Sequence, residues 1–154
     1  MDSKYYFSSP EKVIKLKAIL DSWITPHTPF RHRCGVKGLG ADCIHFCAKV
    51  FDELGILDFN LIKFPAYDPS WHLHNTREQL YEGVFKYLKL EKVDMLNLED
   101  GDLLLGHYGQ AASHASVYLG GYLYHSLNQI GVVKEEYKNS HIRKNLKFAL
   151  RLLA

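Results

Sequence analysis

Three residues of this sequence have the types and positions needed for nucleophilic chemistry: Cys43, His114 and His125. Cys43 follows Asp42, a residue suited to cap a helix, so we expect the thiol in the first turn of that helix. There the helix dipole and unpaired N–H groups lower the pKa of a thiol and favour the thiolate. The same N–H groups can stabilise the oxyanion that forms when a carbonyl is attacked. For Cys43 taken alone, a small buried side chain without a chemical role is the alternative.

The two histidines lie on either side of a glycine turn. His114 opens an apolar stretch, His125 lies in the next one, and Gly120-Gly121 between them is typical of a β-hairpin. Neighbouring strands lie about 4.8 Å apart, so one imidazole can hydrogen-bond to the other. A cysteine, a base and a third polar group that orients the base form a catalytic triad. The alternative is that both are incidental members of a population of nine histidines.

The elements that must position these residues are helices first and strands afterwards. Apolar residues at helical spacing predict three helices: one opening at Pro10, one from Cys43 to about Leu54, and one from Asn75 or Thr76 to about Leu90. Short apolar runs divided by turn signals then predict five strands, at 102–105, 115–119, 122–127, 130–133 and 148–153. This order is typical of an α+β fold in one domain.

Composition excludes several classes of function. The chain has 154 residues and a net charge of +2, which suits one domain and gives no reason to expect a nucleic-acid partner. No stretch reaches the roughly 20 apolar residues of a membrane span. Residues 1–6 lack the pattern of a secretory signal peptide, so we expect synthesis in the cytoplasm. Three cysteines, an odd number, fit a reducing compartment rather than a disulfide framework.

The other histidines and cysteines raise the question of a metal site. Cys43, His45 and Cys47 alternate along the predicted helix, so neighbours in this series point to different helix faces. Zinc sites use ligand pairs at other spacings. We therefore predict no metal and no cofactor. His72 and His74 lie in a predicted loop, where they either line a cleft or decorate the surface.

Four segments, in the same order, resemble the NlpC-type cell-wall cysteine peptidases. They are Gly38–Ile56, similar to the nucleophile helix of the family, Gly101–Leu104, similar to its Gly-Asp-Leu strand, His114–Gly120, similar to its histidine strand, and Tyr124–Ser126, similar to the strand that follows. Two further segments, Thr28–Gly38 and Trp71–His74, resemble the branch associated with bacteriophage tails.

The resemblance implies one papain-like domain over residues 1–154, with N-terminal helices packed on an antiparallel sheet. It implies a cysteine peptidase or amidase that cuts peptidoglycan stem peptides, usually between γ-D-glutamate and a diamino acid. Carried over by position, Cys43 is the nucleophile, His114 the base and His125 the residue that orients the base. Asp42 matches an acid that in some members binds the free amine of the substrate.

The same resemblance sets the expected partners and the rival functions. The partners are peptidoglycan or muropeptides, together with phage-tail or tail-like proteins that would deliver the enzyme to the cell wall. Ile44 and His45 replace the usual Ser and Gly after the cysteine, and Phe30 stands where a tyrosine often supports the oxyanion site. Two alternatives stay open: a thiol acyltransferase of the same fold, and a phage-tail hub or adaptor protein with weakened catalysis.

Overall fold

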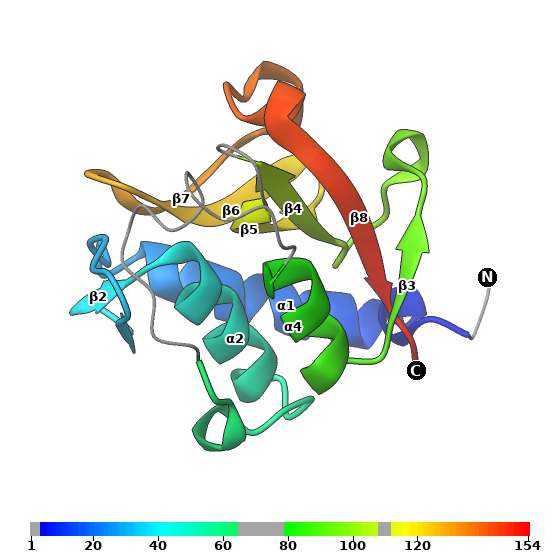
Figure 1. Ribbon diagram of the computed structural model, residues 1–154, viewed down its shortest axis with the longest axis horizontal. Coiled ribbons are helices and arrows are strands. Elements are labelled where there is room, and N and C mark those ends of the chain that lie inside the picture. The colour runs from blue at the N-terminus through cyan, green and yellow to red at the C-terminus, as the bar shows by residue number, and fades with distance from the viewer. Residues whose placement is uncertain (1–3, 65–78, 108–111) are drawn as a thin grey trace.

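Helices dominate the first half of the chain and strands the second, as the sequence predicted (Figure 1). The computed structural model describes residues 4–64, 79–107 and 112–154. The helices are α1 (Pro10–Ile24), α2 (Cys43–Glu53) and α4 (Gln79–Tyr87). Short 3-10 turns lie at Tyr6–Ser8, Phe59–Leu61, Met95–Asn97, Tyr137–Asn139 and Arg143–Asn145.

The main sheet has six strands in the order β3-β8-β4-β5-β6-β7, and every neighbouring pair is antiparallel. The strands are β3 (Leu90–Val93), β4 (Leu103–His107), β5 (Ala112–Leu119), β6 (Tyr122–Leu127), β7 (Gly131–Glu136) and β8 (Leu146–Leu152). A separate small ribbon pairs β1 (Gly35–Val36) with β2 (Gly40–Ala41) directly before α2. Helices α1, α2 and α4 gather on one side of this sheet (Figure 1).

Local sequence signals explain how the two elements that carry the candidate triad begin and turn. Asp42 caps α2, because its carboxylate accepts a hydrogen bond from the His45 N–H at 2.7 Å. Gly120 and Gly121 form the turn between β5 and β6 with φ angles of +58° and +84°. Glycine adopts such positive φ angles readily because it has no Cβ. The predicted cap and the predicted hairpin are therefore both confirmed.

The third helix differs from its prediction. It ends at Tyr87, and Leu90, predicted as its last residue, opens strand β3 instead. Leu90 is buried and pairs with Leu152 of β8, so a partner far along the chain decides its conformation. The predicted start of this helix, at residues 75 and 76, lies outside the described residues.

Alternate residues of the central strand β4 enter two apolar clusters. Leu103 and Leu105 pack with the helices, whereas Leu104 packs with Leu146 and Ala149 on the other face. This alternation is the period of two expected for a strand covered on both faces.

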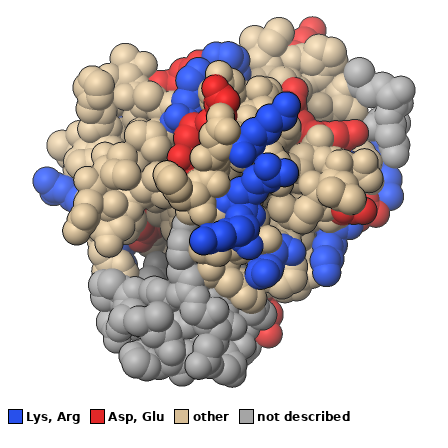
Figure 2. All heavy atoms as spheres, turned by 90° about the horizontal axis from the view of Figure 1, so that it is seen from above, with Lys and Arg blue, Asp and Glu red and all other residues tan. Residues whose placement is uncertain are grey.

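No helix within the described residues is long and apolar enough to cross a lipid bilayer. Lys and Arg form a band on the face shown in Figure 2, with Asp and Glu beside them.

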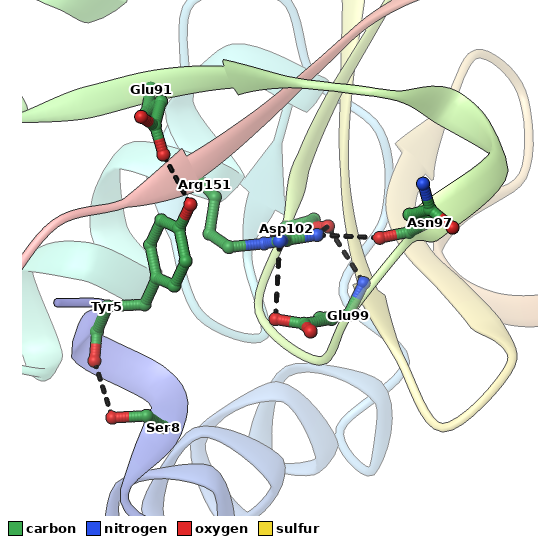
Figure 3. Close-up of polar contacts among 7 residues, drawn as sticks. All are labelled: Tyr5, Ser8, Glu91, Asn97, Glu99, Asp102 and Arg151. Atoms are coloured by element: carbon green, nitrogen blue, oxygen red, sulfur yellow. Dashed lines mark hydrogen bonds and ion pairs between the residues drawn. The ribbon is translucent and has the colours of Figure 1, made fainter. Parts of the chain in front are cut away.

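A buried ion pair joins the last strand to the start of β4 (Figure 3). The Arg151 guanidinium donates two hydrogen bonds to the Asp102 carboxylate, each at 2.9 Å, and a third to the Asn97 carbonyl at 2.7 Å. Asp102 is fully buried and also accepts from the Glu99 N–H at 2.8 Å. Nearby, the Tyr5 hydroxyl donates to Glu91 of β3 (Figure 3). The bonds of Arg151 to Asp102 and Asn97, which we name the Asp102–Arg151 clasp, tie β8 to the segment that leads into β4.

Candidate functional site

Cys43 is the first residue of α2 and lies against the strand that carries His114. Its Sγ is 3.7 Å from the carbonyl oxygen of Ser113, close enough for a weak thiol hydrogen bond. The backbone N–H of Ala115, on the same strand, also hydrogen-bonds to the sulfur and lowers the pKa of the thiol. The N–H groups of Cys43 and Ile44 have the same effect. The thiol thus contacts the backbone of both neighbours of His114.

A second contact ties the start of α2 to the strand that carries His125. The Ser126 hydroxyl donates to the carbonyl oxygen of Ala41 at 2.6 Å, and both residues are buried. Ser126 follows His125, and Ala41 lies two residues before Cys43. The nucleophile helix and the histidine hairpin are therefore held together by hydrogen bonds next to the candidate residues.

The Cys43 thiol is protonated at neutral pH, which corrects our prediction. Burial, and then the negative charge of Asp42, raise the pKa of Cys43 to about 12. The helix N–H groups lower this pKa, as predicted, but desolvation of the thiolate outweighs them because the residue is only 8% exposed. The prediction rested on the helix dipole, whereas burial, named above as the alternative for Cys43 taken alone, is the larger cause.

The two histidines meet as the sequence predicted. The His114 Nε2 and His125 Nδ1 atoms lie 2.9 Å apart and share a hydrogen bond. The hairpin register pairs Val117 with Tyr124, so His114, three residues away, and His125, one residue away, emerge on the same face. Both rings are buried.

Burial keeps both imidazoles neutral at neutral pH. It lowers the pKa of His114 to about 3, with a further contribution from the neighbouring His125. It also lowers the pKa of His125 to about 4, although Glu135 opposes this shift. A neutral imidazole has one nitrogen with a lone pair and can accept a proton there. The site therefore holds a neutral thiol beside a neutral base.

Asp42 has bonding partners for both of its oxygens. Its Oδ1 accepts from the His45 N–H and lies 2.9 Å from His45 Nδ1, and its Oδ2 accepts from the Arg33 N–H at 2.7 Å. The His45 ring stacks on Phe64 with centroids 4.1 Å apart. In the structure Asp42 positions the start of α2, and its binding of a substrate amine stays a prediction.

Sequence analysis missed Glu135, which lies next to the histidine pair. Its Oε1 is 3.1 Å from His125 Nε2. The predicted strand ended at Val133, whereas β7 continues to Glu136. The signal that could have found it is the alternation after Val133, which puts Glu135 on the same strand face as Val133, the residue paired with His125.

The other cysteines and histidines considered for a metal site do not form one in the described part of the chain. Across residues 4–64, 79–107 and 112–154, no three His, Cys, Asp or Glu side chains are grouped to hold a metal ion. Cys47 is buried, and it lines an apolar cavity of about 130 Å³ between α2 and α4. Ile44 and Ala115, the neighbours of Cys43 and His114, also line this cavity. Residues 71, 72 and 74 lie outside the described residues.

Comparisons with known structures support this fold. An NLP/P60-family protein of Staphylococcus aureus, described as similar to a lipoprotein, superposes with a TM-score of 0.66 and 18% identity, covering 100% of this chain and 45% of that one. An NlpC/P60-family protein of Bacillus cereus gives 0.64 and 20%, covering 92% and 40%. NlpC2 of Trichomonas vaginalis gives 0.63 and 12%, covering 100% and 51%. The chain thus spans about half of these proteins or less.

The family itself is identified by sequence. Among curated proteins none matches the chain. The sequence pattern of the NlpC/P60 family, however, matches residues 27–151, which include Cys43, His114 and His125. Members of this family are generally cysteine hydrolases that act on cell-wall peptidoglycan. Matched over most of its length, the chain belongs to the NlpC/P60 family and has its papain-like α+β fold.

Proposed function

We propose that the protein is a cysteine peptidase or amidase that hydrolyses an amide bond in the stem peptide of peptidoglycan. Cys43 is the nucleophile, His114 the base and His125 the residue that orients the base. The observation that carries the proposal is the thiol at a helix N-terminus, lying against both neighbours of a histidine that is hydrogen-bonded to a second histidine. The expected bond joins the γ-carboxyl of D-glutamate to a diamino acid.

The first half of the reaction forms a thioester. His114 takes the thiol proton as Sγ attacks the carbonyl carbon, and the electron pair of the C=O bond moves to its oxygen. N–H groups at the start of α2 stabilise that oxyanion. When the tetrahedral intermediate collapses, the C–N bond breaks, and the leaving amine takes the proton from His114. The acyl group then remains on Cys43.

The second half returns the free thiol. Water loses a proton to His114 and attacks the thioester carbonyl, the C–S bond breaks, and the thiolate takes the proton back. Burial lowers the pKa of His114 and raises that of Cys43, so the resting pair is neutral and the proton moves to His114 only as Sγ attacks. Base and acid are thus the same ring at different steps.

Digestion of purified peptidoglycan tests the proposal. Mass analysis of soluble products should show fragments in which one water has been added across a peptide bond. Cys43→Ala should release none, whereas Cys34→Ala, a matched change at a cysteine outside the site, should match the wild type. Normal release by Cys43→Ala would contradict the proposal. Products that carry an acceptor other than water would favour the acyltransferase alternative.

We also propose delivery to the cell wall within a phage tail or tail-like particle. The support is the resemblance of residues 28–38 to the phage-tail-associated branch of the family. Peptide mass spectrometry of particles purified from the source cells should then detect the protein together with tail components. Detection only outside the particles would contradict this route. Particles that contain a protein inactive on peptidoglycan would favour the adaptor alternative.

A further inference from the structure

Glu135 approaches Nε2 of His125, the ring nitrogen that is not bonded to His114. Val133 pairs with His125 across β6 and β7, so Glu135, two residues further, lies diagonally opposite on the same face. Its Oε1 is 3.1 Å from His125 Nε2, at ion-pair distance but off the direct line of a hydrogen bond. The Ser140 hydroxyl donates to the same oxygen at 2.6 Å and holds it in place.

The hydrogen bond between the two histidines can run in either direction. A neutral imidazole carries one N–H and one lone pair, so one ring must donate and the other accept. If His114 donates from Nε2, its lone pair is on Nδ1, where a proton can be taken up. If His125 donates from Nδ1, the proton of His114 is on Nδ1 instead. Only the first direction makes His114 a base at the nitrogen turned away from His125.

The charge of Glu135 distinguishes these two directions. An ionised carboxylate accepts hydrogen bonds and cannot donate them, so it favours a proton on His125 Nε2. That proton position leaves Nδ1 of His125 as the acceptor for His114. In the opposite case the lone pair of His125 Nε2 would face a negatively charged oxygen, which is unfavourable at a fully buried ring.

We propose that Glu135 is a positioning residue that fixes the tautomer of both histidines and thereby makes His114 a base. Glu135 acts through His125, the ring that its carboxylate approaches. The inference rests on the proposed function of Cys43 and His114, but its physical content, which nitrogen carries the proton, can be measured without a substrate. The shift that Glu135 causes in the pKa of His125 has the direction this contact requires.

The test is nuclear magnetic resonance of ¹⁵N-labelled histidine, which distinguishes protonated from unprotonated ring nitrogens. The wild type at neutral pH should show both His114 and His125 protonated at Nε2. Glu135→Gln keeps the shape but can donate as well as accept, so part of the population should move to the Nδ1–H form. His125→Asn and His114→Asn, each lacking one ring, assign the signals. Unchanged tautomers in Glu135→Gln, or Nδ1–H at His125 in the wild type, would overturn the proposal.

Glu136 provides the matched control. It carries the same charge on the opposite face of β7 and accepts from the Asn139 amide at 2.9 Å, away from the histidines. Glu136→Gln should leave the histidine signals unchanged, and an equal response to both changes would contradict a specific role for Glu135. If Glu135→Gln does not fold, Ser140→Ala should shift the tautomers the same way but less.

Turnover gives a second readout. Glu135→Gln should lower kcat for peptidoglycan peptides roughly tenfold and leave KM unchanged, since general-base contributions reach about 10²–10⁴-fold in total. In a His125→Asn background, where the ring through which Glu135 acts is absent, the same change should have no further effect. Full additivity of the two losses would overturn the proposal. If the tautomers respond but the wild type has no activity, the proposed function fails and the inference stands.

Discussion

Two polar networks in the same sheet differ in how burial affects their charge: one contains an ion pair, and the other contains two uncharged rings. In the Asp102–Arg151 clasp, a fully buried carboxylate faces a guanidinium through two hydrogen bonds, and each charge satisfies the other. The carboxylate raises the pKa of Arg151 further. In the network of His114, His125 and Glu135, burial instead lowers the pKa of both rings, so neither histidine is charged.

This difference separates a structural network from one suited to move protons. The clasp holds two opposite charges against each other and contains no member of the candidate triad, so its removal should change stability and leave the chemistry alone. In the histidine network, the position of each proton depends on which neighbour accepts it. A change there should alter the chemistry more than the fold. The predictions below test this separation, from the largest expected effect to the smallest.

Replacement of the base should have the largest effect. His114→Asn should lower activity by about 10²–10⁴-fold, because an amide cannot take a proton at neutral pH. His125→Asn should retain more activity, because its amide oxygen can still accept from His114. Initial rates of peptidoglycan digestion measure both, and circular dichroism checks that the variants fold. If His125→Asn loses as much as His114→Asn, the assigned roles are wrong.

Opening the clasp should have the largest effect on stability. Arg151→Met leaves Asp102 buried without its counter-charge and should cost about 3 kcal/mol, the low end for such pairs because 12% of the Arg151 side chain is exposed. Urea denaturation measures this cost. Lys4→Met, which removes an exposed ion pair to Glu91, should leave the midpoint almost unchanged. Activity per folded molecule should match the wild type in both, and a large loss in Arg151→Met would contradict the separation.

The two networks also differ in how far the sequence reveals them. Asp42 as a cap and Gly120-Gly121 as a turn are local signals, and together with the four family segments they gave the fold and the meeting of the two histidines. Strand β3 was missed because its pairing with β8 depends on residues about 60 positions away. Glu135 was missed because the predicted strand ended at Val133, and the register of β6 and β7 brings its carboxylate to His125. The pKa of Cys43 depends on burial, which no local pattern contains.

Acid should destabilise the protein through the buried histidines. In the unfolded chain a histidine gains a proton near pH 6.5, whereas the folded rings stay neutral down to about pH 3 to 4. The unfolded state therefore binds more protons between these values, and stability falls as the pH falls. From pH 7.5 to pH 5 the loss should be about 2 kcal/mol for each buried histidine.

Urea denaturation at both pH values measures this dependence. His125→Asn should lose part of it, whereas a change at the exposed His141 should not. Equal pH dependence in the wild type and His125→Asn would show that the ring is charged when folded. The histidine network would then resemble the clasp, and the separation drawn above would not hold.

The smallest predicted effect concerns the charge next to the nucleophile. Asp42→Asn keeps a good helix cap but removes the negative charge that raises the pKa of Cys43. The pH dependence of iodoacetamide alkylation should therefore move to lower pH, by on the order of one unit or less because burial remains the larger cause. Asp52→Asn, which removes a charge nearer the other end of α2, is the matched control and should leave the curve in place.

The same variant also tests whether Asp42 binds the substrate amine. If the carboxylate serves only to cap α2 and to hold His45, Asp42→Asn should change KM equally for peptides with a free and with an acetylated N-terminus. A rise in KM confined to the free amine would show that Asp42 binds it, in addition to the bonds that it makes within the chain. An alkylation curve that moves to higher pH would mean that the cap, rather than the charge, controls the thiol.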